Sequence, residues 1–491
     1  MKTNSLDFDA QALREKILDL AMRGKLVPQD PNDEPASVLL EKIKAEKAEL
    51  IKEKKIKKTK PLPPITDDEK PFDIPDSWEW VRLGDVAKKI TDGTHNPPPN
   101  SHEGKQVISA INIKKGKIDF SLSDRFVSEE QFLKEDKRTH IRRGDILLTI
   151  VGSLGNAAIV DTDTLFTAQR SVAVIDSSTS SQFLYYALIS SMFKNQILAN
   201  AKGTTQKGIY LKKLTILELP IPPLLEQSRI AAKIAQLFAL LRKVETSTQQ
   251  YAKLQTLLKS KVLDLAMRGK LVKQDPNDEP ASVLLEKIKA EKQELIKEKK
   301  IKKTKPLPPI TDDEKPFDIP DSWEWVRLGE ICEIKGGKRV PKGRKLEDQV
   351  SYKPYIRVAD MQDHSVNTDT LKYASKDIFN EISRYTISSK DVYFSIAGTI
   401  GKVGSIPEKL DGSLLTENAA KLDFFAAQEM NKKFFIEMLS SDFIKEQHKK
   451  MLSKVAQPKL ALIKLKKTII PLPPLSEQKR VVRKILQIFS L

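Results

Sequence analysis

Residues 75–84 read PDSWEWVRLG, and residues 320–329 read PDSWEWVRLG again. The match extends far upstream of this stretch, because residues 18–84 recur as residues 263–329 at a constant offset with two substitutions. Self-similarity over such a length indicates that one supersecondary arrangement is used twice in the chain. The tryptophans of the repeated stretch are predicted to be hydrophobic anchors of the strand that opens each domain.

A shorter repeat closes each unit, where LPIPPLLEQSRI (219–230) returns as IPLPPLSEQKRV (470–481). Two segments, 85–218 and 330–469, lie between the opening and closing repeats and share little overall identity. Their short β-branched runs and glycine turns predict mixed α/β globules with considerable strand. A constant frame suits docking of the same partner twice, and variable inserts suit reading of two different ligands.

The two inserts nevertheless keep a common skeleton. GDILLTIVGSLGN (144–156) matches KDVYFSIAGTIGK (390–402) in pattern, and QKGIYLKKL (206–214) parallels QPKLALIKL (457–465). The glycines inside the first pattern are predicted to set backbone turns rather than to bind phosphate. The inserts are therefore expected to share one fold.

A heptad seam crosses the centre of the chain. Its positions alternate spacings of four and three from Ile230 through Val244 and Tyr251 to Leu265. Such a pattern predicts one long coiled-coil helix over about residues 225–268. The glycine that follows this helix is a suitable C-cap.

The chain ends carry the two halves of a second seam. Residues 13–20 repeat the end of the central seam, and residues 481–488 repeat its beginning. We therefore expect the terminal helices to pair in a pseudo-twofold, circular molecule. Residues 36–53 and 281–298 are predicted to be further helices, each opened by a proline. The KKTKPLPPI stretches that follow are predicted to be extended basic linkers.

Composition narrows the function classes. The chain has 491 residues, 40% of them hydrophobic, a formal net charge of +18 and a pI near 9.4. This balance fits several folded domains and a polyanionic partner, although a merely basic, ribosome-like protein has the same charge. Cys332 is the single cysteine, which excludes an internal disulfide and a cysteine-based zinc site. No apolar run reaches membrane-spanning length and no secretory signal is evident, so a cytoplasmic protein is expected.

At this point the sequence resembles the specificity subunit of type I restriction–modification systems. The closing motifs LPIPPLLEQ (219–227) and LPPLSEQKR (472–480) carry the resemblance, together with the strand-turn pattern at 144–155 and DGTH at 92–95. The nearly identical repeat of 18–84 resembles the branch of the family typified by EcoAI. The match covers essentially the whole chain.

The resemblance implies an α+β protein with two mixed α/β target-recognition domains separated by long antiparallel coiled-coil helices. Each domain would read half of an asymmetric, bipartite double-stranded DNA site in the major groove. The helices would set the spacing and recruit two methyltransferase subunits, and two motor-nuclease subunits would complete the complex. The chain itself would be non-catalytic, with no cofactor or metal.

The implied domain boundaries follow the repeats. They are a conserved helical region (1–74), the first target-recognition domain (75–225), a central coiled-coil region (226–319), the second target-recognition domain (320–476) and a C-terminal helix (477–491).

The residues themselves give little support for catalysis. HNPPP (95–99) is superficially similar to an amino-methyltransferase loop, but Pro99 cannot stack on a flipped base. AGTIGK (397–402) lacks the glycine spacing of a phosphate loop, and Val403 replaces its Ser or Thr. The five histidines show no ligand spacing. A stand-alone methyltransferase or nuclease is therefore disfavoured. A coiled-coil scaffold without DNA specificity remains the other alternative, which the two different inserts argue against.

DNA reading requires Arg or Lys for guanine, Asn or Gln for adenine, and cations for phosphate, all on loops near a groove. For each such residue a solvated surface position is the competing interpretation. The candidates in the first insert are Lys114, Arg125, Arg138, His140, Arg142, Arg143, Gln169, Arg170, Lys202, Thr204, Thr205, Gln206 and Lys207. The candidates in the second insert are Lys335, Lys338, Arg339, Lys342, Arg344, Lys345, Arg357, Arg384, Tyr385, Lys402, Asn418, Lys454, Gln457 and Lys459.

Overall fold

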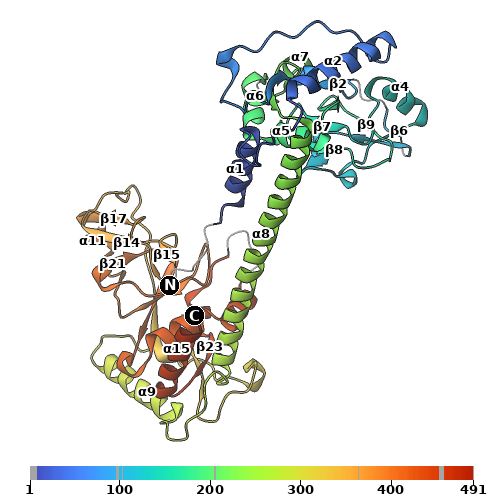
Figure 1. The fold of residues 1–491 in the computed structure, drawn as a ribbon. Helices are drawn as coiled ribbons and strands as arrows, with labels where there is room; N and C mark the ends of the chain where they lie inside the picture. The colour runs from blue at the N-terminus through green and yellow to red at the C-terminus, as the bar shows by residue number, and fades with distance from the viewer. Residues whose placement is uncertain are drawn as a thin grey trace. The chain divides into compact units, whose positions relative to one another are not determined.

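The computed structural model of the chain (Figure 1) describes residues 8–95, 99–101, 103–203, 206–362, 364–452 and 458–489. The chain divides into two compact units, one ending at Gln249 and the other beginning at Gln250. Within the described ranges, no helix is both long enough and apolar enough to cross a bilayer.

The first unit contains helices and short strands in alternation. Its helices are α1 (Ala10–Met22), α2 (Ala36–Lys52), α3 (Leu83–Val86), α4 (Glu129–Thr139), α5 (Ser181–Ile189), α6 (Ser191–Asn200) and α7 (Leu211–Leu214). Its strands are β1 (Glu79–Arg82), β2 (Ala87–Asp92), β3 (Lys105–Ile108), β4 (Ile113–Lys114), β5 (Lys117–Ile118), β6 (Phe126–Val127), β7 (Ile146–Thr149), β8 (Ala157–Ile159), β9 (Thr167–Ala168), β10 (Val172–Ser177) and β11 (Glu218–Ile221).

The second unit repeats this order with small differences. Its helices are α9 (Ala281–Lys297), α10 (Leu328–Ile331), α11 (Lys376–Ile382), α12 (Lys432–Leu439), α13 (Asp442–Met451), α14 (Leu462–Lys466) and α15 (Leu475–Phe489). Its strands are β12 (Glu324–Arg327), β13 (Cys332–Gly336), β14 (Lys353–Ile356), β15 (Met361–Gln362), β16 (Ser365–Val366), β17 (Lys372–Ala374), β18 (Thr386–Ile387), β19 (Val392–Ser395), β20 (Val403–Gly404), β21 (Ser413–Leu415), β22 (Ala419–Phe424) and β23 (Ile469–Leu472).

Each unit is organised around a four-stranded antiparallel sheet. The strand order is β2-β10-β7-β8 in the first unit and β13-β22-β19-β20 in the second, so the two inserts share one fold as expected. Successive side chains of β7 alternate between two cores, because strand residues point to opposite faces. Ile146 and Leu148 pack with α5 and α6, whereas Leu147 packs with Ile108 and Phe166 on the other face.

The repeated opening and closing stretches meet as a two-stranded frame at each insert. β1 pairs antiparallel with β11, and β12 pairs antiparallel with β23. Trp78 and Trp323 are 3% and 4% exposed beside these strands, which confirms their prediction as anchors. The turn glycines are also as predicted, since Gly152 and Gly398 have φ of +80° and +72°.

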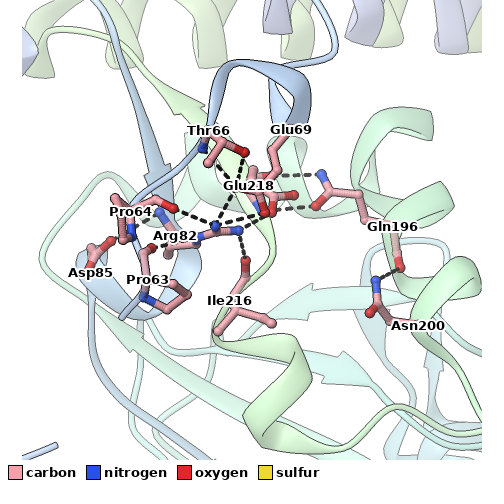
Figure 2. A network of polar contacts seen from close by, with 10 residues as sticks. All are labelled: Pro63, Pro64, Thr66, Glu69, Arg82, Asp85, Gln196, Asn200, Ile216 and Glu218. Atoms are coloured by element: carbon pink, nitrogen blue, oxygen red, sulfur yellow. Dashed lines mark hydrogen bonds and ion pairs between the residues drawn. The ribbon is translucent and has the colours of Figure 1, made fainter. Parts of the chain in front are cut away.

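A buried arginine ties the basic linker to the frame of the first unit (Figure 2). The Arg82 guanidinium donates to the backbone carbonyls of Pro63, Pro64 and Ile216 and forms ion pairs with Glu69 and Glu218. Residues 57–65 form neither helix nor strand, and the carbonyls of two of their prolines are free to accept from this side chain. In the second unit Arg327 makes the corresponding contacts to Glu314 and the carbonyls of the later linker.

The closing Glu-Gln motif fastens the next helix to the same frame. Glu226 accepts hydrogen bonds from Trp78 Nε1 at 3.0 Å and from Gln29, and burial raises its pKa. Gln227 accepts from the Ser180 backbone N–H and donates to the Pro222 carbonyl. Glu477 and Gln478 make the equivalent contacts in the second unit. The motif is therefore a structural joint.

The predicted central helix is confirmed as α8 (Leu224–Met267). Its seam is buried at both ends, where Ile230 is 0% and Val262 4% exposed. The middle is different, because Val244, Tyr251 and Leu258 are 44%, 59% and 49% exposed. The globular cores cover only the seam's ends, so the coiled-coil packing expected for its middle is not observed in the described structure. The pairing of the two terminal helices stays a prediction.

Candidate nucleic-acid interface

Some of the predicted DNA-reading residues lie together at one edge of each four-stranded sheet, where two neighbouring strands meet their loops. In the first unit these strand-end loops are residues 92–95 and 168–171, and in the second they are residues 336–339 and 415–418. Backbone bonds hold each pair together, such as Thr94 N to Ala168 O at 2.8 Å and Lys338 N to Leu415 O at 2.9 Å.

Glycine is required at the point where the two loops cross. A Cβ atom on Gly93 would lie 2.0 Å from the Ala168 carbonyl oxygen, and one on Gly337 would lie 2.2 Å from the carbonyl oxygens of Leu415 and Thr416. No side chain fits so close to backbone, so the DGTH and GGKR stretches owe their glycine to this approach. The neighbouring side chains are thereby held at the sheet edge.

In the first unit a carboxylate organises this edge. Asp92 accepts from Arg138 Nη1 at 3.0 Å and lies 2.7 Å from His95 Nε2. The side chain of Asp92 is 12% exposed, whereas those of His95 and Arg138 are 63% and 42% exposed. Gln169 and the exposed Arg170 follow on the second loop. Predicted residues 138, 169 and 170 thus lie together with an unpredicted histidine.

The second unit carries a different set at the same edge. Glu417 pairs with Arg339 Nε at 2.7 Å, and its backbone carbonyl accepts from Lys459 Nζ at 3.2 Å. Lys338 and Asn418 flank these residues, and Lys338 Nζ lies 5.7 Å from the ring centroid of Tyr385. The sequence pattern predicted all of these positions except Glu417.

Several other predicted residues are held by the protein itself. Arg142 forms a bidentate pair with Asp136, Arg143 with Asp163 and Arg357 with Asp360. These contacts reduce, without abolishing, the capacity of the three arginines to bind another anion. Lys402 Nζ donates to the backbone carbonyls of residues 358 and 361. These contacts indicate a structural role for Lys402.

The remaining predicted residues are scattered or lie outside the described ranges. Thr204, Thr205, Lys454 and Gln457 belong to the latter group. The others belong to segments outside the strand-end loops, and they are Lys114, Arg125, His140, Lys202, Gln206, Lys207, Lys342, Arg344 and Lys345. Lys335 and Arg384 instead line a cavity beside the second unit's loops.

Sequence reasoning missed two kinds of residue at these edges. Asp92 and Glu417 position basic neighbours, but carboxylates do not fit the pattern of donor residues that predicts DNA-reading positions. Lys421 lines the cavity beside Lys335 and Arg384, and it was missed because it lies in the interior of β22. The polar position within Ala419–Leu422 was the available signal, since an alternating strand places it on one face.

Burial perturbs charges near the first edge. Asp145, at the start of β7, accepts from the Arg142 N–H at 2.8 Å, and burial raises its pKa from 3.8 to about 6. Lys89 donates to the Thr139 carbonyl at 2.7 Å, and burial lowers its pKa. The parts of the chain that the structure describes contain no group of three or more His, Cys, Asp or Glu side chains arranged for a metal ion.

Comparison with known proteins identifies the family. The profile of the type I restriction modification DNA specificity domain matches residues 75–255 and 320–490. The EcoAI specificity subunit of Escherichia coli is 34% identical over 97% of this chain and 88% of its own length. The EcoEI specificity subunit of Escherichia coli is 38% identical over 66% of this chain and 62% of its own length.

Solved structures share the fold. The HsdS subunit from Thermoanaerobacter tengcongensis aligns with a TM-score of 0.50 and 22% identity, covering 86% of this chain and 91% of that one. A chain from a study of complex assembly and conformational transition of the type I R-M system aligns with a TM-score of 0.55 and 22% identity, covering 86% of this chain and 92% of that one. With its duplicated domain, this chain belongs to the family of type I restriction–modification specificity subunits, in the EcoAI-like branch, and such subunits are not themselves enzymes.

Proposed function

We propose that each unit reads one half of an asymmetric, bipartite DNA site in the major groove. The readers are the target-recognition domains at residues 75–225 and 320–476. The conserved helical regions set the distance between the half-sites and recruit two methyltransferase subunits, with two motor-nuclease subunits completing the complex. Specificity then resides in this chain and chemistry in its partners.

One observation carries the proposal: the same sheet edge holds different hydrogen-bonding side chains in the two units. The first edge offers His95, Gln169 and Arg170, whereas the second offers Lys338, Arg339 and Asn418. Arginine suits guanine and amides suit adenine in the major groove, so two different sets favour two different half-sites. A scaffold without specificity has no use for such a difference.

The near-identity of the repeated regions supports recruitment of equivalent partners. α2 and α9 differ at one position, Ala48 against Gln293, and both keep exposed charges along their outer faces. Two equivalent surfaces on one chain suit two copies of one partner, because the same surface must meet the same complement.

The direct test is single-base mapping of methylated positions in cells that carry this chain and its methyltransferase subunit. Wild type should give a bipartite, asymmetric motif that vanishes without the chain. Arg170→Ala should relax the first half-site alone and Lys459→Ala the second alone, whereas Lys134→Ala, an exposed charge on α4, should change neither. Methylation that persists without the chain would refute the proposal.

The role of α8 as a spacer has its own test. Inserting one heptad between Val244 and Tyr251, where the helix is exposed, lengthens it by about 10 Å. At about 3.4 Å per base pair, the unread spacer should grow by about three base pairs while both half-sites stay the same. An unchanged spacer in the methylation map would contradict this role.

A further inference from the structure

A cavity of about 200 Å³ opens beside the strand-end loops of the second unit. Lys335, Arg384 and Lys421 line it, together with the backbone of Gly336 and Gly337. Three cationic side chains around one small cavity form a site for an anion rather than for an apolar group.

The two lysines face each other across the sheet. Lys335 on β13 and Lys421 on β22 occupy directly opposite positions in the antiparallel register. Like charges in that relation destabilise a sheet, because their Cβ atoms are only about 5 Å apart. Glu333 pairs with Lys335 at 2.5 Å and Asp391 with Lys421 at 3.4 Å, but Arg384 forms no ion pair with any carboxylate that the structure describes. Asp423 also lies near both lysines, but the residues that line the cavity include three cations and no carboxylate.

The first unit carries a carboxylate at the strand position that corresponds to Gly336 of the second unit. Strand register places Asp92 where the second unit has Gly336, opposite Ala173 and Ala420 respectively. Asp92 accepts a hydrogen bond from Arg138. Arg138 precedes β7 in the first unit, as Arg384 precedes β19 in the second. Thr91 and Val174 replace the two lysines there. The second unit thus keeps the arginine, adds two lysines and lacks the carboxylate.

We propose that this cavity binds one backbone phosphate of the DNA, and that the described residues of the first unit form no equivalent site. The inference rests on the proposed DNA-reading function, and it gives the two units different contacts to the DNA backbone. Lys335, Lys421 and Arg384 supply the charge, and a glycine stands at 336 where the strand register of the first unit has Asp92. A phosphate contact fixes the register of a domain on the duplex without reading sequence.

The sharpest test is Gly336→Asp, which installs the first unit's carboxylate in the second. A Cβ atom at 336 would meet only the Leu462 side chain at 3.4 Å, an ordinary contact, so the variant should fold. Gly336→Ala is the matched control without charge. Arg384→Gln removes a cation from the same cavity and provides an independent second variant.

The measurement is the affinity of the full chain for a fluorescent 30-base-pair duplex at 50–200 mM KCl, read by anisotropy. Losing one phosphate contact should reduce the slope of log affinity against log salt by about 0.9, so the ratio of affinities at 50 and 200 mM should fall about three- to fourfold. Gly336→Asp and Arg384→Gln should show this loss, and Gly336→Ala should keep the wild-type slope.

The other outcomes separate the two proposals. Salt-dependent DNA binding by wild type with unchanged slopes in both charge variants would overturn the phosphate site and leave DNA reading intact. No DNA binding by wild type would instead remove the proposed function. Calorimetry with inorganic phosphate forms the second arm, in which binding to wild type but not to Gly336→Asp, with equal DNA slopes, would assign the cavity to a free anion and overturn the inference.

Discussion

Arg82 is the charge whose removal should damage the fold most, and the repeated frame supplies its own control. Arg82 is 3% exposed and pairs with Glu69 and with Glu218, a carboxylate on β11 whose pKa is raised by burial (Figure 2). Arg327 occupies the same place in the second unit, but its strand partner is Ile469 where the first unit has Glu218. The two arginines therefore differ by one buried carboxylate.

The expected loss of stability depends on which groups each substitution leaves without a counter-ion or hydrogen-bond partner. Arg82→Met leaves Glu218, whose side chain is only 14% exposed, without its counter-ion, which costs about 3–5 kcal/mol. Arg327→Met leaves backbone carbonyls and Glu314 without their donor. Because the Glu314 side chain is 37% exposed and can hydrate, this substitution should cost about 1–3 kcal/mol of stability. Glu218→Ile copies the second unit and should be close to neutral by itself. Combined with Arg82→Met, it should recover about 2 kcal/mol of the loss.

Hydrogen exchange followed by mass spectrometry is the suitable assay, because a chain of two units does not unfold in two states. Peptides covering β1 and β11 report on the first frame, and peptides covering β12 and β23 serve as the internal reference in the same sample. Equal losses for Arg82→Met and Arg327→Met, or costs for Arg82→Met and Glu218→Ile that simply add, would refute the reasoning about the buried carboxylate.

Three further predictions concern single positions. His448 is buried against Thr468 with its pKa lowered to about 4, so the second unit should lose roughly 3 kcal/mol as pH falls from 6.5 to 4, a loss absent from His448→Ile in exchange measured at both pH values. The raised pKa of Asp145 gives the opposite dependence of stability on pH, because the folded state holds the proton more tightly than the unfolded state. The first unit should therefore lose roughly 2 kcal/mol as pH rises from 4 to 6, and Asp145→Asn should flatten this dependence in hydrogen exchange of the first unit's peptides across that range. Gly24→Ala should lower the thermal midpoint more than Gly144→Ala. Both glycines have positive φ (+66° and +95°), but a Cβ at 24 would lie 2.4 Å from Pro75, whereas one at 144 meets no atom within 4 Å. An equal drop would mean that backbone strain, and not the steric clash, sets the loss.

Features that depend on neighbours along the chain could be predicted from the amino-acid sequence. Heptad spacing located α8 to within about one residue at each end, and proline and glycine located the ends of helices and the turns. The repeats predicted two copies of one fold, because identical local sequences have identical local preferences. Resemblance in the closing motifs and the repeat pointed to the right family.

Which charged side chains remain available for DNA depends on the folded arrangement. Arg142 and Arg357 look alike in sequence to Arg170 and Arg384, yet among the described residues carboxylates pair with the first two and with neither of the second two. The register of β13 against β22 places Lys421 opposite Lys335, although the two are far apart in the chain. The exposed middle of the α8 seam likewise depends on how far the two cores reach. Local patterns cannot contain such information, because ion pairs and burial are set by segments that meet only when the chain has folded.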